Sequence, residues 1–254
     1  MHSFCFHRAI RSLALGMTIA VAATITRAES PDVALATFVE QGAKTEQVST
    51  QDVRRILIDG SAILLDTRTP AEYAAGHIPG ARNVGGGPAA QIAAVTHLTG
   101  GDKTVALVLY CNGPYCQASR RLSDQLLEAG FTNVRRYQLG IPVWRALGGP
   151  TEITVDGLAR IYGRDQTAVF VDARSPEEFA SGSLTGARSL PVDLYVSGVL
   201  KQPPLPEDDF NTRIVLFGRD AKQARALAQA LSTRPWHNVS YVAATFEEVR
   251  AALR

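Results

Sequence analysis

The residues whose side chains could most readily take part in a reaction form one short segment, Tyr110–Gln117 (YCNGPYCQ). It contains two thiols, Cys111 and Cys116. An apolar run over residues 105–110 precedes it and a helical pattern follows it, so we expect a loop between a strand and a helix. The first turn of a helix carries partial positive charge, and a curled loop directs backbone N–H groups inward. Both effects stabilise a thiolate, the nucleophilic form of cysteine. Cys111 is therefore the candidate nucleophile, and an inert buried thiol at a strand end is the alternative.

The elements that must position this loop occur twice in the chain. Residues 63–82 read ILLDTRTPAEYAAGHIPGAR and residues 169–188 read VFVDARSPEEFASGSLTGAR, at a constant offset of 106. A match of this length at one offset indicates a duplicated domain.

Each copy has the same expected order of a helix, an apolar strand, a turn-rich segment, a second apolar strand and another helix. The first copy has a helix over 50–57, strands over 63–65 and 105–110, and a helix from Ala118 that stops near Gly130; the second has a helix over 155–161 and strands over 169–171 and 214–217. Apolar strands that alternate with helices indicate an α/β fold, with a mainly parallel central sheet flanked by helices in each copy. We expect the copies to span residues 48–149 and 150–254.

The N-terminal segment differs from the rest of the chain. A basic start precedes an uncharged apolar run over residues 13–25, and Thr26-Arg27-Ala28 places small residues at the positions that a signal peptidase reads. The run is shorter than the about 20 residues that span a bilayer. We predict a signal peptide over residues 1–28, a periplasmic or secreted protein and no stable membrane anchor after cleavage; an uncleaved anchor is the alternative. Residues 29–47 have no clear partner in the repeat and are interpreted as a helical N-terminal extension.

The charge and the cysteine and histidine content exclude some functions and favour another. Removing Arg8, Arg11 and Arg27 with the signal peptide leaves 23 basic residues against 24 acidic ones, so we expect no nucleic-acid partner. Cys5 leaves with the same segment, and the two remaining cysteines enclose too small a loop to stabilise a fold substantially. At least one of them is expected to have a chemical role. The histidines lack the spacing of metal ligands, so we expect no metal site.

Two separated motifs and the order of the elements resemble the rhodanese family. The first motif, DTRTPAEYAAGHIPGAR over residues 66–82, precedes the cysteine loop by about 30 residues, and the second is LGIPVWRALGGP over residues 139–150. The matching positions are Asp66, Arg68, Pro70, Glu72, Tyr73, Gly76, His77, Ile78, Pro79, Gly80, Ala81, Gly140 and Trp144. The resemblance covers residues 48–149 in full, whereas residues 151–254 match the scaffold without the loop. It implies two tandem rhodanese-like domains.

The resemblance also implies a sulfurtransferase that uses covalent catalysis at Cys111. The thiolate would take the outer sulfur of a small donor such as thiosulfate as a persulfide, and a thiol, cyanide or a protein acceptor would remove it. Backbone N–H groups of the loop would hold the anionic groups. The substrate-binding loop consists of Asn112, Gly113, Pro114, Tyr115, Cys116 and Gln117. This chemistry implies no cofactor.

The loop departs from the family pattern at its last position. That residue, often basic or hydroxylic in the family, is Cys116, and no Lys or Arg lies between Cys111 and Gln117. A weaker attraction for an anionic donor follows; Arg120 and Arg121 could compensate, or they could form a solvated helix face. Cys116 itself leaves two alternatives open. It acts as a relay or resolving thiol, by attacking a Cys111 persulfide or closing a disulfide with Cys111, or it packs as a small residue at the helix start.

The second copy is expected to be inactive. Gly218 stands where Cys111 would align, and this half contains no cysteine. Asp66 and Arg68 recur in that copy, so we interpret them as a structural ion pair that supports the fold. His77 aligns with a serine and is not interpreted as a general base.

Two other functions remain as alternatives. A phosphatase or arsenate reductase would need a longer loop that ends in Arg, whereas Gln117 stands six positions after Cys111. A non-catalytic sulfur-binding or redox-switch module that uses Cys111 and Cys116 is the alternative from a different functional class.

Overall fold

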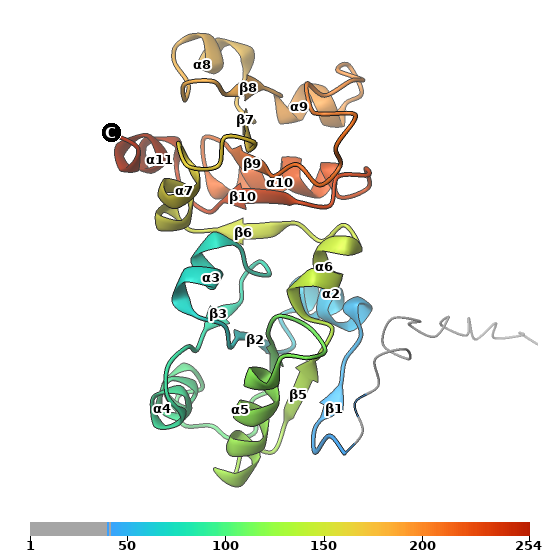
Figure 1. Cartoon of the computed structure of the whole chain (residues 1–254), viewed down its shortest axis with the longest axis vertical. Helices are drawn as coiled ribbons and strands as arrows, with labels where there is room; N and C mark the ends of the chain where they lie inside the picture. Colours follow the sequence, from blue (N-terminus) through green and yellow to red (C-terminus); the bar gives the residue numbers. More distant parts are fainter. Residues whose placement is uncertain (1–39, 41) are drawn as a thin grey trace, which may run out of the picture. The chain divides into compact units, whose positions relative to one another are not determined.

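The computed structural model describes residue 40 and residues 42–254, which form two five-stranded sheets (Figure 1). The strand orders are β1-β5-β4-β2-β3 and β6-β10-β9-β7-β8, and every pairing between these strands is parallel. The first sheet consists of β1 (Glu46–Gln47), β2 (Ile63–Asp66), β3 (Arg82–Asn83), β4 (Leu107–Tyr110) and β5 (Val134–Tyr137). The second consists of β6 (Thr151–Ile153), β7 (Val169–Asp172), β8 (Arg188–Ser189), β9 (Ile214–Phe217) and β10 (Val239–Val242). The prediction of two tandem α/β domains with parallel sheets is confirmed.

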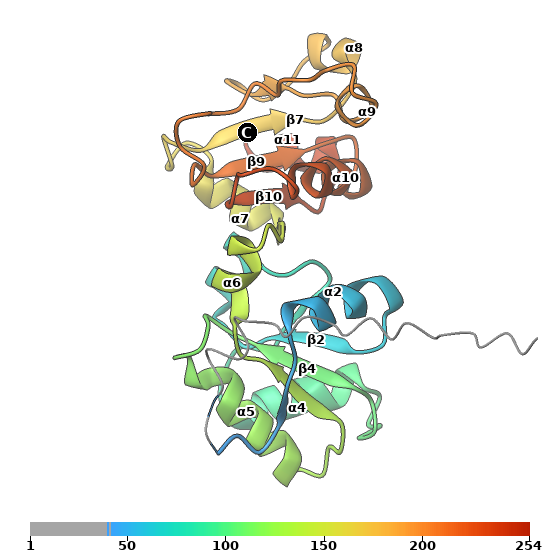
Figure 2. The same cartoon turned by 90° about the vertical axis from the view of Figure 1, so that its right-hand side faces the viewer.

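Helices cover both faces of each sheet (Figure 2). Those of the first domain are α2 (Thr50–Asp59), α3 (Pro70–Ala75), α4 (Pro88–Leu98), α5 (Gln117–Glu128) and α6 (Gly140–Ala146). Those of the second are α7 (Val155–Ile161), α8 (Pro176–Ala180), α9 (Val192–Val196), α10 (Ala221–Leu231) and α11 (Phe246–Ala252). On one face of the first sheet, Leu64 and Val108 pack with α2 and α6; on the other, Leu65 and Leu109 pack with α4 and α5. Burial on both faces explains why these strands are continuous apolar runs in the sequence.

Equivalent helices begin at equivalent caps in the two copies. Thr69 and Glu72 form a capping box at the start of α3, and Ser175 and Glu178 form the same box at the start of α8. A proline follows the cap residue in each case, where its fixed φ suits the first helical position. The repeated motif therefore encodes the caps that start α3 and α8 within a few residues.

The helical interpretation of the N-terminal extension is wrong at its C-terminal end, the part that the structure describes. Glu46 and Gln47 form the edge strand β1, paired with Arg135 and Arg136 of β5, and are not helical. Their counterpart in the second sheet is β6, which pairs with β10 in the same way. A strand of two residues is too short to show a period, so its identity depends on the pairing rather than on the pattern.

The predicted signal peptide over residues 1–28, and residues 29–39 and 41 of the extension, lie outside the described residues. In the part of the chain that the structure describes, no helix is long and apolar enough to cross a bilayer.

Candidate active site

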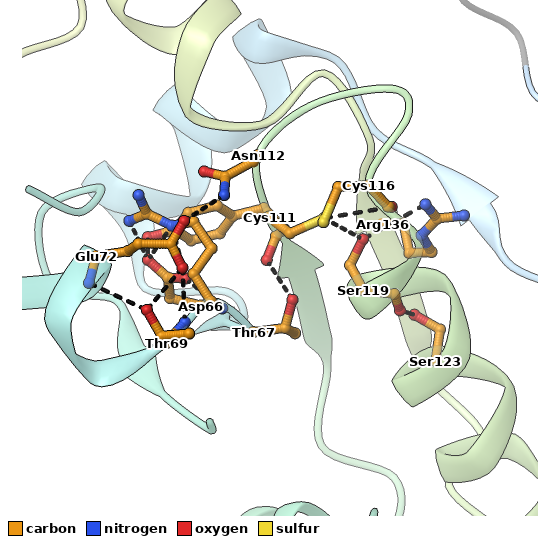
Figure 3. The surroundings of a disulfide bond; sticks show 12 residues. Asp66, Thr67, Thr69, Glu72, Cys111, Asn112, Cys116, Ser119, Ser123 and Arg136 are labelled. Atoms are coloured by element: carbon orange, nitrogen blue, oxygen red, sulfur yellow. Dashed lines mark hydrogen bonds and ion pairs between the residues drawn. A yellow bond between two sulfur atoms is a disulfide. The ribbon is translucent and has the colours of Figure 1, made fainter. Parts of the chain in front are cut away.

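Cys111 follows the last residue of β4 and lies at the carboxyl end of the first sheet, before α5 (Figure 3). Only 1% of the residue is exposed to solvent. Ligands of open α/β sheets bind at this edge, so the placement suits a reacting group. Thr67 donates a hydrogen bond from Oγ1 to the carbonyl oxygen of Tyr110, 3.0 Å away, which ties the end of β2 to the residue before the thiol.

The structure joins Cys111 to Cys116 by a disulfide, with their Cα atoms 6.3 Å apart. That separation lies within the range usual for disulfides. Cys116 is also the N-cap residue of α5, and Gln117 begins the helix. The described state is therefore the oxidised one, in which Cys111 has no free thiolate.

Glycines let the loop curl tightly against the start of α6. Gly113 has a φ of +106° and Gly140 a φ of +63°, both in the region that disfavours residues with a Cβ. A Cβ on Gly140 would overlap the carbonyl oxygen of Cys111 and lie 2.5 Å from the nitrogen of Gly113. The Ile141 N–H donates to that same Cys111 carbonyl oxygen at 3.1 Å. The first turn of α6 therefore holds the loop in place through close backbone contact.

Replacement of Gly140 by alanine is expected to lower the free energy of unfolding by about 2–4 kcal/mol, because a positive φ and an overlap with backbone both become unfavourable. Urea denaturation followed by circular dichroism measures the loss. Gly60→Ala is the matched control: Gly60 also has a positive φ, of +66°, but a Cβ added there would meet nothing within 4 Å. Equal losses for the two variants would show that the contact with the loop contributes nothing.

Asn112, the residue after Cys111, is anchored by the cap of α3. Asn112 donates from Nδ2 to Oε1 of Glu72 at 2.6 Å. Hydrogen bonds from Thr69 and then from Asn112 hold the pKa of Glu72 below its usual range. Glu72 is thus a carboxylate that caps α3 with one oxygen and positions the loop with the other.

Asp66 and Arg68 form a buried ion pair at the end of β2. Arg68 donates from Nε to Asp66 Oδ1 at 3.0 Å and from Nη2 to the carbonyl oxygen of Gly76 at 2.7 Å. Tyr110 donates its hydroxyl proton to Asp66 Oδ2 at 2.7 Å, and burial followed by the Asp66 charge raises the pKa of Tyr110 well above its usual value. The pair thus links β2, β4 and the end of α3.

The second copy has the same ion pair but no cysteine. Arg174 donates from Nε to Asp172 at 3.0 Å and from Nη2 to the carbonyl oxygen of Gly182 at 2.8 Å. A Cβ on Gly218 would lie 3.0 Å from Gln223 Oε1 and 3.1 Å from a backbone nitrogen, so the shortened loop leaves little space for a thiol.

A salt bridge takes the place of the Asn112–Glu72 contact in the second copy. Arg219 donates from Nε and Nη2 to Glu178, each at 2.9 Å. These hydrogen bonds lower the pKa of Glu178 to about 2. The cap glutamate therefore keeps its contact with the loop in the copy that lacks the cysteine.

A polar chain behind Cys111 was missed in the sequence. Ser119 Oγ of α5 lies 3.4 Å from Cys111 Sγ, and Arg136 Nη2 of β5 lies 3.4 Å from Ser119 Oγ (Figure 3). Arg136 is only 1% exposed and also forms an ion pair with Glu40. The available signal was an arginine at an inward position of a strand, VRRY, which is unusual without a buried partner.

The two arginines considered on α5 have different environments. Arg120 donates from Nη1 to Glu40 at 2.8 Å, so it is neither a free cation nor a fully solvated one. Arg121 lines a surface cavity of about 300 Å³ together with residues of the segments that follow β2 and β3. Among residue 40 and residues 42–254, no cluster of three or more His, Cys, Asp or Glu side chains could hold a metal ion.

Comparisons with known proteins agree with this architecture. The family described as the rhodanese-like domain matches residues 49–147 and again residues 154–252. A curated relative, the HTH-type transcriptional regulator Rv0324 of Mycobacterium tuberculosis (strain ATCC 25618 / H37Rv), is 34% identical over 122 residues, which are 48% of this chain and 51% of the relative. The chain thus spans about half the length of the curated relative it matches.

Solved structures give similar matches. A thiosulfate sulfurtransferase from Pseudomonas aeruginosa is 24% identical, with 84% of this chain and 45% of that chain covered and a TM-score of 0.35. SseA from Escherichia coli, from a study of 3-mercaptopyruvate sulfotransferases, is 17% identical, with 78% and 98% covered and a TM-score of 0.36.

Proposed function

The chain belongs to the rhodanese family, and on that premise we propose that its first domain is a sulfurtransferase that carries sulfane sulfur on Cys111. The observation that carries the proposal is the position of this thiol. Its sulfur lies at the carboxyl end of β4, before the first turn of α5 and 3.4 Å from the Ser119 hydroxyl. Such surroundings favour a thiolate and an anionic persulfide.

The proposed reaction has two half-reactions. The Cys111 thiolate attacks the outer sulfur of a donor such as thiosulfate; the new S–S bond forms as the donor's S–S bond breaks, and its electron pair leaves with sulfite. A thiol or cyanide then attacks the outer sulfur of the persulfide, takes it, and restores the thiolate. A persulfide intermediate of this kind gives ping-pong kinetics.

Backbone donors of the loop would stabilise the anions. The Cys116 N–H donates to the carbonyl oxygen of Gly113 at 3.0 Å, and Pro114 has no N–H. The N–H groups of Asn112, Gly113, Tyr115 and Gln117 are the loop donors that we propose for the persulfide and the donor's oxygens.

The donor, the acceptor and the compartment are parts of the same proposal. We propose a small-molecule sulfur donor, a thiol, cyanide or protein acceptor, and export to the periplasm or medium. Disulfides persist in such oxidising compartments, so the Cys111–Cys116 bond supports export.

Mass spectrometry of the reduced protein tests the proposal. After incubation with thiosulfate, the peptide that contains residues 111–116 should gain the mass of one sulfur atom, and cyanide or a thiol should remove it. A polysulfide serves as a second donor, because the loop lacks a cation. Reduced protein that gains no sulfur from either donor, or gains it on another peptide, would contradict the proposal.

A redox switch is the second candidate, favoured by the disulfide itself. In this case Cys116 would protect or silence Cys111 under oxidising conditions through thiol–disulfide exchange. Equilibration in glutathione buffers of stated ratio, followed by mass spectrometry, measures whether the pair titrates within the potential range of the proposed compartment.

A further inference from the structure

A buried arginine stands behind the reactive loop, which contains no basic residue of its own. We infer that Arg136 is a positioning residue that acts through Ser119 and favours the thiolate and persulfide forms of Cys111. The inference rests on the proposed function only in that it takes Cys111 to react as a thiolate.

The burial of Arg136 is the first argument. The residue is 1% exposed, and its Nε is buried with no hydrogen-bond partner among the residues that the structure describes. Among the described residues, its guanidinium contacts the Glu40 carboxylate and Ser119 Oγ. Keeping a charge in such a place costs free energy that an apolar residue of similar size would avoid.

The direction of the hydrogen bonds is the second argument. A guanidinium can only donate, so Ser119 Oγ must accept from Arg136 Nη2, 3.4 Å away. The hydroxyl proton of Ser119 is then directed at Cys111 Sγ, also 3.4 Å away. Ser123 does not compete for this hydroxyl, because it donates to the backbone carbonyl of Ser119 at 2.8 Å.

Distance is the third argument. Two consecutive contacts of 3.4 Å place Arg136 Nη2 no more than 6.8 Å from the Cys111 sulfur. A positive charge at about this range stabilises an anion measurably when both are shielded from water. The carbonyl oxygen of Cys116, 3.3 Å from the same sulfur, favours the protonated thiol instead. Arg136 and the directed Ser119 hydroxyl act against this dipole and favour the thiolate.

Other charges near the loop modify the effect. Glu40 lies between Arg136 and Arg120 and offsets part of their positive charge. Arg121 lies one residue further along α5 and lines a surface cavity with residues of the segments that follow β2 and β3. Glu40→Gln should therefore strengthen the effect of the arginines and lower the pH at which Cys111 reacts. This is the opposite of the change expected for Ser119→Ala.

The remaining charged groups on the β2 side have contacts that do not involve the polar chain. Glu72 is a carboxylate that accepts hydrogen bonds from Asn112 and Thr69, and Asp66 forms an ion pair with Arg68. Replacing residues of the polar chain should leave these groups unchanged.

The test is the pH profile of alkylation. Reduced full-length protein that carries Cys116→Ser is treated with iodoacetamide from pH 4 to pH 10, and the Cys111 peptide is followed by mass spectrometry. Ser119→Ala should move the midpoint of the profile upward by about 1 pH unit. The double variant Arg136→Gln with Glu40→Gln should also move it upward but by less, because the two removed charges have opposite effects and Arg136 is the one that contacts Ser119. Glu40→Gln alone should move it downward. Arg136→Lys, which keeps the charge, should stay closer to the parent.

Ser123→Ala is the matched control, because it also removes the hydroxyl of a buried serine of α5, 0% exposed. The Ser123 hydroxyl donates to the Ser119 backbone carbonyl and not to the Cys111 sulfur. Circular dichroism measures whether each variant is folded. If the double variant unfolds, the inference is still tested by the single variants Ser119→Ala, Glu40→Gln and Arg136→Lys. The inference is overturned if Ser119→Ala shifts the midpoint no more than Ser123→Ala, or if Glu40→Gln raises it. Failure of sulfur loading would leave this profile unchanged and would instead contradict the proposed function.

Discussion

Oxidised protein is expected to accept no sulfur until the Cys111–Cys116 disulfide is reduced. In the disulfide, the Cys111 sulfur is bonded to the Cys116 sulfur and cannot form a thiolate. A sulfane donor is attacked only by a thiolate. Reduction with dithiothreitol, followed by its removal, should raise the initial rate of sulfur loading from thiosulfate by about two orders of magnitude or more. The mass of the loop peptide gives both the redox state and the sulfur gained.

Cys116→Ser is the informative variant for this prediction. It cannot form the disulfide, so its loading should be independent of reductant. Turnover equal to that of reduced wild type would assign Cys116 to switching or packing, whereas a lower turnover would assign it to a sulfur relay. Oxidised wild-type protein that loads as fast as reduced protein would refute the need for a free Cys111 thiol.

Cys111→Ser is expected to abolish sulfur transfer, with a loss of at least about 1,000-fold in kcat/KM. Serine is nearly isosteric, so the contacts of the loop should survive. Its hydroxyl is protonated at neutral pH and cannot hold sulfane sulfur as a persulfide. Thiocyanate formed from thiosulfate and cyanide measures the rate in steady state.

The matched control is again Cys116→Ser, which makes the same chemical change five positions away and breaks the same disulfide. Comparing the two variants separates loss of the nucleophile from loss of the cross-link. If Cys111→Ser kept a tenth or more of the wild-type rate, the nucleophile would have to lie elsewhere, and the sulfurtransferase proposal for this loop would fail.

Much of the fold could be predicted because its signals are local. The apolar runs of β2 and β4 and the cap residues Thr69 and Ser175 encode elements within a few residues. Gly130, with a φ of +91°, follows α5 as the pattern indicated. The predicted helix over 155–161 has the bounds that the structure gives to α7. Strand ends were less accurate, since β4 begins at Leu107 rather than at residue 105.

Three features follow from the residues without any tertiary information: the position of Cys111 between a strand and a helix, the duplication, and the absence of a cysteine from the second copy. The tertiary structure alone decided what lies behind the thiol. Pairing of Leu107 with Val134 aligns β5 beside β4, and this register brings Arg136 to Ser119 across 17 residues and to Glu40 across 96. No periodicity spans such separations, because the contacts arise from packing of whole elements rather than from neighbouring residues. The cation that the loop lacks in the sequence is therefore found only when the sheet is assembled.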